Sequence, residues 1–125
     1  MIQEYILDSN ILIYYLKKDK KIRNTLTKLN REYFFLSTIT HVEVLEGAKD
    51  KKDFKMIQEM LNRFVPLDFK RETAVAAIQL KMASSKKLKF KDLLIAATAL
   101  VEGLTMVTAD KDFKGIPGLK LKLLS

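Results

Sequence analysis

The sequence predicts a three-layer α/β/α fold, in which a short, mostly parallel sheet lies between two layers of helices. Four short apolar segments, at residues 2–7, 34–36, 105–108 and 119–123, have the composition of β-strands, and longer segments with helical spacing separate them. This alternation is typical of parallel sheets whose strands are joined by right-handed crossovers. The chain shows no repeat, linker or internal boundary, so we expect one domain, residues 1–125, with a core of its own.

Strand and helix patterns alternate along the whole chain. Apolar runs predict the strands, and apolar residues that recur every three or four positions, such as Ile11, Leu12, Tyr15 and Leu16, predict the helices. In order, we expect strand 2–8, helices 10–18 and 20–30, strand 33–37, helices 38–48 and 51–63, strand 64–68, helices 71–85 and 91–103, strand 104–108, a turn at 110–115 and strand 119–123.

A few residues mark where helices begin and end. Ser37 or Thr38 would begin the helix that follows, and Asp50 would cap the next one. Asp92 stands before a long uncharged stretch, so we expect it to be buried and to cap that helix. Gly103 would end the same helix, because glycine readily adopts the backbone conformation of a helix stop.

Composition narrows the chemistry that this chain can perform. It contains no cysteine and one histidine, His41, so disulfides, thiolate sites and histidine-rich metal sites are excluded. Any metal would be held by oxygen ligands, which favour Mg²⁺ or Mn²⁺. The first residues lack the pattern of a signal peptide, and no apolar stretch has the length of a membrane span. We therefore expect a cytoplasmic protein without membrane contact.

The chain is strongly basic. Lys and Arg number 23 against 15 Asp and Glu, which gives a net charge of +8. This excess predicts a polyanionic partner such as nucleic acid, although a solvated basic surface would account for the charge equally well.

Four acidic residues stand out against this basic background. Asp8 and Asp110 each follow an apolar strand, where parallel α/β sheets bind their ligands. Asp92 heads a helix, and Glu43 lies within one. Singly, each acid has an ordinary role as a helix cap, a turn residue or a surface charge, and Asp112 could replace Asp110.

Convergence of these acids would have a large energetic cost. Two carboxylates about 5 Å apart repel by roughly 3 kcal/mol at an effective dielectric constant of about 20. Several such pairs would remove much of the stability of a small domain, which is about 5–15 kcal/mol. A convergent cluster therefore predicts a bound divalent cation.

Basic residues cluster in two segments. The first surrounds the junction of the first two helices and comprises Lys17, Lys18, Lys20, Lys21 and Arg23. The second leads towards Asp92 and comprises Lys81, Lys86, Lys87, Lys89 and Lys91. Because it approaches a candidate site acid, the second is the better candidate for binding RNA phosphates, in particular through Lys86, Lys87, Lys89 and Lys91. Each lysine alone could equally be a solvated residue of an exposed linker.

Four segments, in this order, resemble the PIN domain family and, within it, the VapC-type toxin ribonucleases. The segments are Leu7–Leu12, Ser37–Gly47, Asp92–Ala99 and Val107–Phe113. The resemblance covers nearly the whole chain. It implies a PIN fold and an endoribonuclease that depends on Mg²⁺ or Mn²⁺. It also implies a homodimer that pairs with a VapB-type antitoxin.

The resemblance also assigns roles to residues of the site. The acidic positions of the family, which would be catalytic and hold the metal, are matched by Asp8, Glu43, Asp92 and Asp110. The supporting polar residues would be Ser9, Asn10, Thr108 and Asp112. The chain departs from many relatives at residues 89–91, Lys-Phe-Lys, where they carry a proline-containing turn. This difference concerns the start of the helix and local substrate contacts.

The expected reaction is hydrolysis of an RNA phosphodiester by metal-activated water. Asp8 and Asp92 would hold the principal ion, and Glu43 and Asp110 would complete the cluster or orient water. The alternatives are a PIN nuclease of RNA processing and a non-catalytic PIN scaffold that binds RNA. A phosphotransfer receiver domain has little support, because the strand that ends at Ser37 lacks a phospho-acceptor aspartate.

Helix 51–63 offers a candidate partner surface. Phe54, Met56 and Met60 could line a groove for an antitoxin helix, although burial in the core is the default expectation for each of them.

Overall fold

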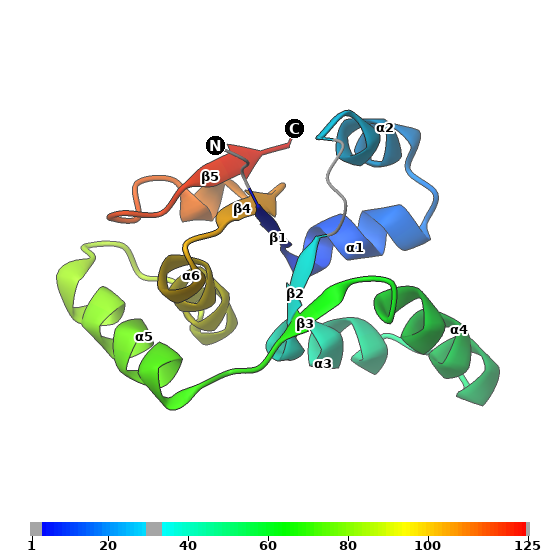
Figure 1. Cartoon of the computed structure of the whole chain (residues 1–125), viewed down its shortest axis with the longest axis horizontal. Coiled ribbons are helices and arrows are strands. Elements are labelled where there is room, and N and C mark those ends of the chain that lie inside the picture. Colours follow the sequence, from blue (N-terminus) through cyan, green and yellow to red (C-terminus); the bar gives the residue numbers. More distant parts are fainter. Residues whose placement is uncertain (1–3, 30–33, 125) are drawn as a thin grey trace.

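Five short parallel strands form the central sheet of the protein (Figure 1). The structure, a computed structural model, describes residues 4–29 and 34–124. The strands are β1 (Tyr5–Leu7), β2 (Phe35–Ser37), β3 (Val65–Leu67), β4 (Thr105–Thr108) and β5 (Leu121–Leu123). They lie in the order β3-β2-β1-β4-β5, and every neighbouring pair is parallel. The expected parallel sheet is confirmed.

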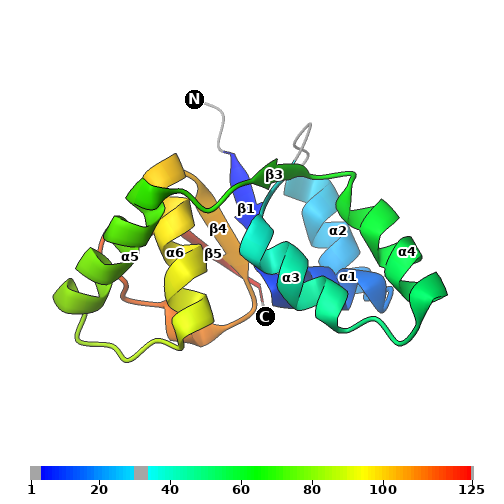
Figure 2. The same ribbon diagram turned by 90° about the horizontal axis from the view of Figure 1, so that it is seen from below.

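Helices cover both faces of this sheet, which confirms the three layers. Within the described ranges they are α1 (Ser9–Leu16), α2 (Lys20–Leu29), α3 (Thr38–Glu46), α4 (Lys51–Leu61), α5 (Arg71–Ala83) and α6 (Phe90–Glu102), with a 3-10 turn η1 (Lys111–Phe113) before β5. Figure 2 shows α5 and α6 on one side and α1 to α4 on the other. None of the described helices is both long and apolar enough to cross a membrane.

Alternate side chains of the neighbouring strands β1 and β4 enter two separate cores, one for each helical layer. Tyr5 and Leu7 of β1 pack with α1 to α4, whereas Ile6 between them packs with α5 and α6. Val107 and Met106 of β4 divide in the same way. All five side chains are buried. Because both faces of the sheet are covered, its strands are continuous apolar runs in the sequence.

Every expected helix and strand is present, and their ends lie within two residues of the expected positions where the structure describes those positions. Residues 2, 3, 30 and 33, which were assigned to these elements, lie outside the described residues. Three predicted end signals are confirmed. Asp50 caps α4 and Ser37 caps α3 through their side chains, and Gly103 ends α6 in the left-handed region with φ +68°.

The prediction that Asp92 caps α6 is wrong. The helix begins at Phe90 with Lys89 in the cap position, so Asp92 is its third residue. A lysine side chain cannot accept hydrogen bonds from the free N–H groups of the first turn, so the sequence gives no capping signal there. Asp92 is instead half-buried in the first turn of α6.

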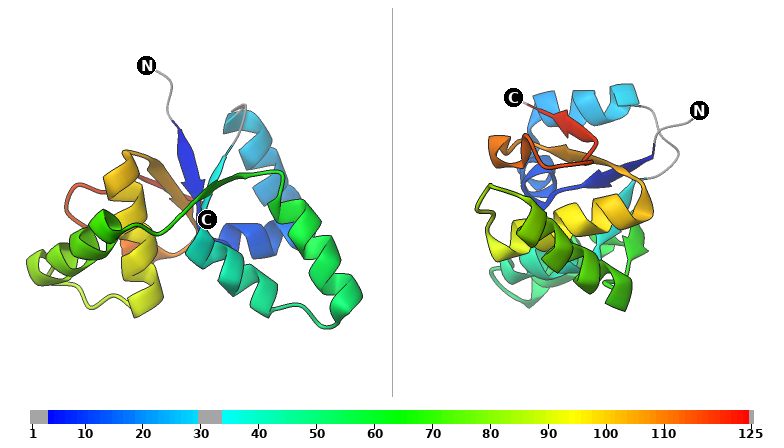
Figure 3. Two further views of the ribbon diagram at one scale, coloured as in Figure 1. Left: turned by 60° about the horizontal axis from the view of Figure 1, so that its bottom comes forward. Right: turned by 90° about the vertical axis from the view of Figure 1, so that its left-hand side faces the viewer.

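The strand order places a switch point between β1 and β4. From β1 the chain adds β2 and β3 on one side, and then crosses to add β4 and β5 on the other. Open parallel sheets bind ligands beyond the carboxyl ends of their strands at such a point. Asp8 directly follows β1, and Asp110 comes two residues after β4. In Figure 3, left, α3 and α6 lie on opposite sides of the end of β1, so both helices border this point.

Candidate active site

Asp8 lies at the centre of the switch point. It is 5% exposed and caps α1, and its Oδ1 accepts the N–H of Ser9 at 2.7 Å. Its Oδ2 accepts the hydroxyl of Thr108 at 2.7 Å. Burial raises the pKa of Asp8, and the charges of Glu43 and Asp110 raise it further, while the two hydrogen bonds oppose this change. Asp8 is therefore a fixed carboxylate whose negative charge is poorly compensated by the protein.

Thr108 joins the ends of β1 and β4. Its fully buried hydroxyl donates to Asp8 and accepts the N–H of Asp110 at 3.0 Å. Asn10 strengthens the same junction, because its Nδ2 approaches Thr108 Oγ1 at 3.4 Å and its Oδ1 accepts the N–H of Ala109 at 3.3 Å. The bonds that Thr108 makes with Asp8 and Asn10, and the bond from Ala109 to Asn10, connect residues about 100 positions apart in the sequence. Together with the local bond from Asp110 to Thr108, they hold Asp8 and Asp110 at one edge of the sheet.

Glu43 enters from α3. Its Oε2 lies 3.5 Å from the hydroxyl of Ser9 and 4.0 Å from the ammonium group of Lys91. Burial raises the pKa of Glu43, and Lys91 opposes that effect, while the charge of Asp92 reinforces it. Glu43 therefore interacts with a hydroxyl group of α1 and with two charged residues of α6.

Asp92 has a strongly raised pKa. Burial first, and then the charges of Asp8 and Asp110, raise its pKa from 3.8 to about 6. Lys89 acts against this rise, and Asp112 adds slightly to it. No hydrogen bond to the Asp92 carboxylate is formed by the residues that the structure describes. Its raised pKa therefore reflects burial and repulsion without a compensating donor.

Asp110 and Asp112 form the turn after β4. Asp110 Oδ1 accepts the N–H of Asp112 at 2.9 Å and so caps η1. Asp110 is half-buried, and its negative charge raises the pKa of neighbouring acids. Asp112 is exposed. Of the two candidates for this position, Asp110 is the one whose charge acts on both Asp8 and Asp92.

The structure thus brings the four predicted acids close enough for their charges to act on one another. Their side chains do not form a complete set of metal ligands. In the described part of the chain, no three acidic or histidine side chains are arranged closely enough to hold a metal ion as they stand. Carboxylates that repel one another stay apart until a cation compensates their charge. Their oxygens are the ligands that hard divalent ions prefer.

The profile of the PIN domain family matches residues 5–119. The chain belongs to the PIN domain family. A ribonuclease VapC2 of Rickettsia felis is 30% identical to this PIN domain over 128 residues, which cover 94% of this chain and 96% of the relative. A tRNA(fMet)-specific endonuclease VapC of Salmonella typhimurium is 27% identical to this chain, and the aligned region covers 95% of this chain and 96% of the relative.

Solved structures agree with these relatives. The VapBC2 structure of Rickettsia felis, bound to a promoter DNA fragment, contains a chain that matches 98% of this PIN domain and 100% of its own length with a TM-score of 0.87 at 27% identity. A toxin–antitoxin complex of Klebsiella pneumoniae matches 93% of this chain and 95% of its own with a TM-score of 0.81 at 30% identity. The resemblance inferred from the sequence motifs is confirmed.

The lysines predicted to bind RNA lie at different positions around the acids of this PIN domain. Lys86 Nζ donates to the carbonyl oxygen of Asp112 at 2.9 Å, so it ties the α5–α6 loop to the turn that carries Asp110. Lys91 and Lys89 act on Glu43 and Asp92, respectively. Lys87 is exposed. A role in RNA binding stays a prediction for each of them.

The sequence did not single out Thr40 as a site residue. Thr40 precedes Glu43 by three residues on α3 and is fully buried, and its Oγ1 has no hydrogen-bond partner in the described part of the protein. The available signal was the i, i+3 spacing of the two residues, which places them on the same side of a helix.

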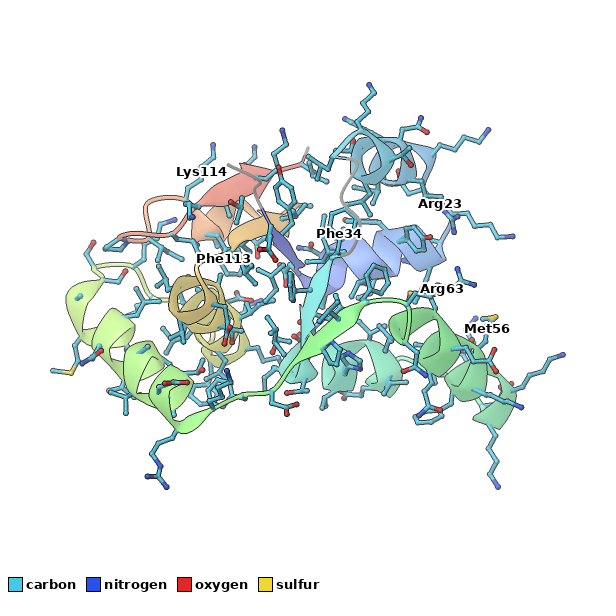
Figure 4. The ribbon with its side chains drawn as sticks, viewed as in Figure 1. Arg23, Phe34, Met56, Arg63, Phe113 and Lys114 are labelled. Carbon is cyan, nitrogen blue, oxygen red and sulfur yellow. The ribbon has the colours of Figure 1, made fainter. Side chains whose placement is uncertain are left out.

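The predicted partner surface on α4 is only partly present. Met60 is 8% exposed and belongs to the core, so it does not line an outer groove. Phe54 and Met56 are 43% and 57% exposed. Met56 points away from the body of the protein (Figure 4). Met60 differs because it follows Ile57 by three residues, and both lie on the side of α4 that faces the sheet.

Proposed function

We propose that this PIN domain is the endoribonuclease toxin of a VapBC-type toxin–antitoxin system and that it depends on Mg²⁺ or Mn²⁺. The proposal is carried by four acids whose charges act on one another at the switch point of the sheet, and they are Asp8, Glu43, Asp92 and Asp110. Burial and this repulsion raise the pKa of the first three. An acidic cluster on a chain of net charge +8 suits a site that holds a cation and cuts a polyanion. The relatives named ribonuclease VapC support the activity.

The donor set fits a hard divalent ion. Divalent metal ions are used generally by PIN-domain nucleases. Asp8 and Asp92 would hold the principal ion, with Glu43 and Asp110 completing the set. When bound, the ion supplies a water molecule of lowered pKa and neutralises charge on the attacked phosphate. The raised pKa values of three of these acids support the assignment, because a nearby cation would lower each of them.

The other residues of the site position these acids and the substrate. Thr108 fixes one oxygen of Asp8, and Ser9 approaches Glu43, so each hydroxyl orients a carboxylate. Four lysines on or near the α5–α6 loop would bind RNA phosphates without recognising the base sequence. These lysines are Lys86, Lys87, Lys89 and Lys91.

A VapB-type antitoxin is the proposed protein partner. The matched structures of Rickettsia felis and Salmonella typhimurium are VapBC complexes. The exposed Phe54 and Met56 on α4 support a docking surface for an apolar segment of the antitoxin. Replacing Met56 by Glu should weaken a complex with the purified antitoxin without affecting the fold, which titration calorimetry and circular dichroism would measure.

Self-association through α5 is the proposed basis of a homodimer. Val75, Ile78 and Met82 are 54%, 49% and 81% exposed and lie on one stripe of the helix. A pair of α5 helices from two copies of this chain would cover both stripes and remove these apolar side chains from water. Light scattering should show a dimer for the wild type and a monomer for Ile78→Glu.

A cleavage assay separates the enzyme from a non-catalytic RNA-binding scaffold. Purified protein is incubated with total RNA in Mg²⁺, in Mn²⁺ and in excess EDTA. The proposal predicts fragments in either metal and intact RNA in EDTA. RNA that binds but stays intact under all three conditions would favour the scaffold. Cleavage restricted to a precursor transcript would favour a nuclease of RNA processing.

A further inference from the structure

Lys91 has a position that the expected role in phosphate binding does not explain. It is the second residue of α6, directly before Asp92, and its side chain reaches across to α3. Two ion pairs form between described residues, and the Lys91–Glu43 pair is the one that involves a site acid. A lysine that serves only the substrate would have no reason to approach a carboxylate of the metal site.

The charges around Glu43 make Lys91 its principal counter-ion. Asp92 and Glu46 both act on Glu43 as like charges, and Lys91 is the positive group that opposes them. Lys89 acts on Asp92 instead. The cluster therefore contains an internal cation next to one of the residues proposed to complete the metal site.

An ammonium group and a divalent ion cannot both use Glu43 without repelling each other. The Lys91 side chain is 62% exposed and its pair is long, at 4.0 Å, so little holds it in place. An RNA phosphate bound nearby would carry a negative charge, as the carboxylate of Glu43 does, and would offer Lys91 an alternative partner.

We propose that Lys91 is an exchangeable counter-ion that occupies Glu43 in the metal-free protein and transfers to an RNA phosphate when the metal ion binds. This inference rests on the proposed metal-dependent nuclease function. Two consequences follow. Lys91 competes with the metal ion in the absence of RNA, and RNA relieves that competition by drawing Lys91 away. By reciprocity, metal binding strengthens RNA binding by the same factor.

Mn²⁺ affinity, measured by electron paramagnetic resonance or calorimetry, tests this without relying on turnover. We expect Lys91→Met to bind Mn²⁺ about fivefold or more tightly than the wild type when RNA is absent. A short oligoribonucleotide that a gel shows to stay intact throughout the titration should tighten Mn²⁺ binding to the wild type but not to Lys91→Met. Lys91→Arg, which keeps the charge, should behave like the wild type. Lys55→Met, which removes an exposed lysine of α4, is the matched control and should leave Mn²⁺ affinity unchanged.

The outcomes separate this inference from the function on which it rests. Wild-type protein that binds Mn²⁺, with equal or weaker binding by Lys91→Met, would overturn the exchange of Lys91 and leave the metal site intact. Unchanged coupling between RNA and Mn²⁺ in Lys91→Met would overturn it as well. Wild-type protein that binds no Mn²⁺ at millimolar concentration would overturn the proposed metal dependence and the exchange together.

Discussion

Replacing Asp92 by Asn should stabilise the metal-free protein at neutral pH. The pKa of Asp92 is raised from 3.8 to about 6, so its ionised form is less stable in the folded protein than in the unfolded chain. A shift of this size corresponds to about 3 kcal/mol at about 1.4 kcal/mol per pKa unit. Because Asp92 is half-buried, solvent screening reduces the expected gain to about 1–2 kcal/mol. Asparagine removes the charge with almost no change in shape.

The sign of the effect depends on pH. Near pH 4, Asp92 keeps its proton in the folded protein and is only about half ionised in the unfolded chain, so its effect on the free energy of unfolding is small. As pH rises towards about 6, the unfolded chain has already lost this proton while the folded protein still holds it. The free energy of unfolding of the wild type therefore falls with rising pH until Asp92 is ionised in the folded protein as well. The advantage of Asp92→Asn should therefore be small near pH 4 and complete at pH 7.5.

Thermal unfolding in EDTA at pH 7.5 and pH 4 measures this difference. A gain of 1–2 kcal/mol corresponds to about 4–8 °C in Tm for a domain of this size. Glu59→Gln on α4 removes an exposed carboxylate and should change Tm little at either pH. An Asp92→Asn protein that is equally or less stable than the wild type at pH 7.5 would refute the view that repulsion and burial strain this site. Saturating Mg²⁺ should raise the Tm of the wild type more than that of the variant.

Three further predictions concern activity and RNA binding. Asp8→Asn should abolish RNA cleavage in Mg²⁺ while circular dichroism shows an intact fold, and cleavage by the pure variant would contradict the role of Asp8. Thr108→Val removes the hydrogen-bond donor to Asp8. It should lower the cleavage rate about 10–100-fold and the free energy of unfolding by about 1–3 kcal/mol. Thr27→Val, at an exposed position, is the control and should change neither quantity much. RNA affinity should fall on a log–log plot against salt with a slope of about −0.7 per phosphate contacted, and a salt-independent affinity would contradict a role for Lys86, Lys87, Lys89 and Lys91.

Local signals explain why the elements could be predicted. The buried strands are apolar runs, and Asp50, Ser37 and Gly103 carry side chains or backbone preferences that mark helix ends. The start of α6 was misjudged because Lys89 has no such signal. Met60 was left open because its spacing alone does not say which side of α4 faces the sheet.

The arrangement of the site depends on contacts that no local pattern records. Asp8 and Asp110 could be assigned to strand ends from the sequence, but their proximity requires β4 to pair with β1, and strand order is a property of the whole chain. The pairing of Lys91 with Glu43 requires α3 and α6 to approach each other across the end of the sheet. Such distant pairings are set by packing of the complete fold.

The bond between Thr108 and Asp8 also determines when the acidic cluster can be completed during synthesis of the chain. During synthesis, Asp8, Glu43 and Asp92 all emerge before β4, which supplies both the clamp on Asp8 and the fourth acid, Asp110. An unfinished chain that stops before β4 lacks both the donor to Asp8 Oδ2 and the fourth acid. The complete four-acid cluster can therefore form only when translation is almost finished.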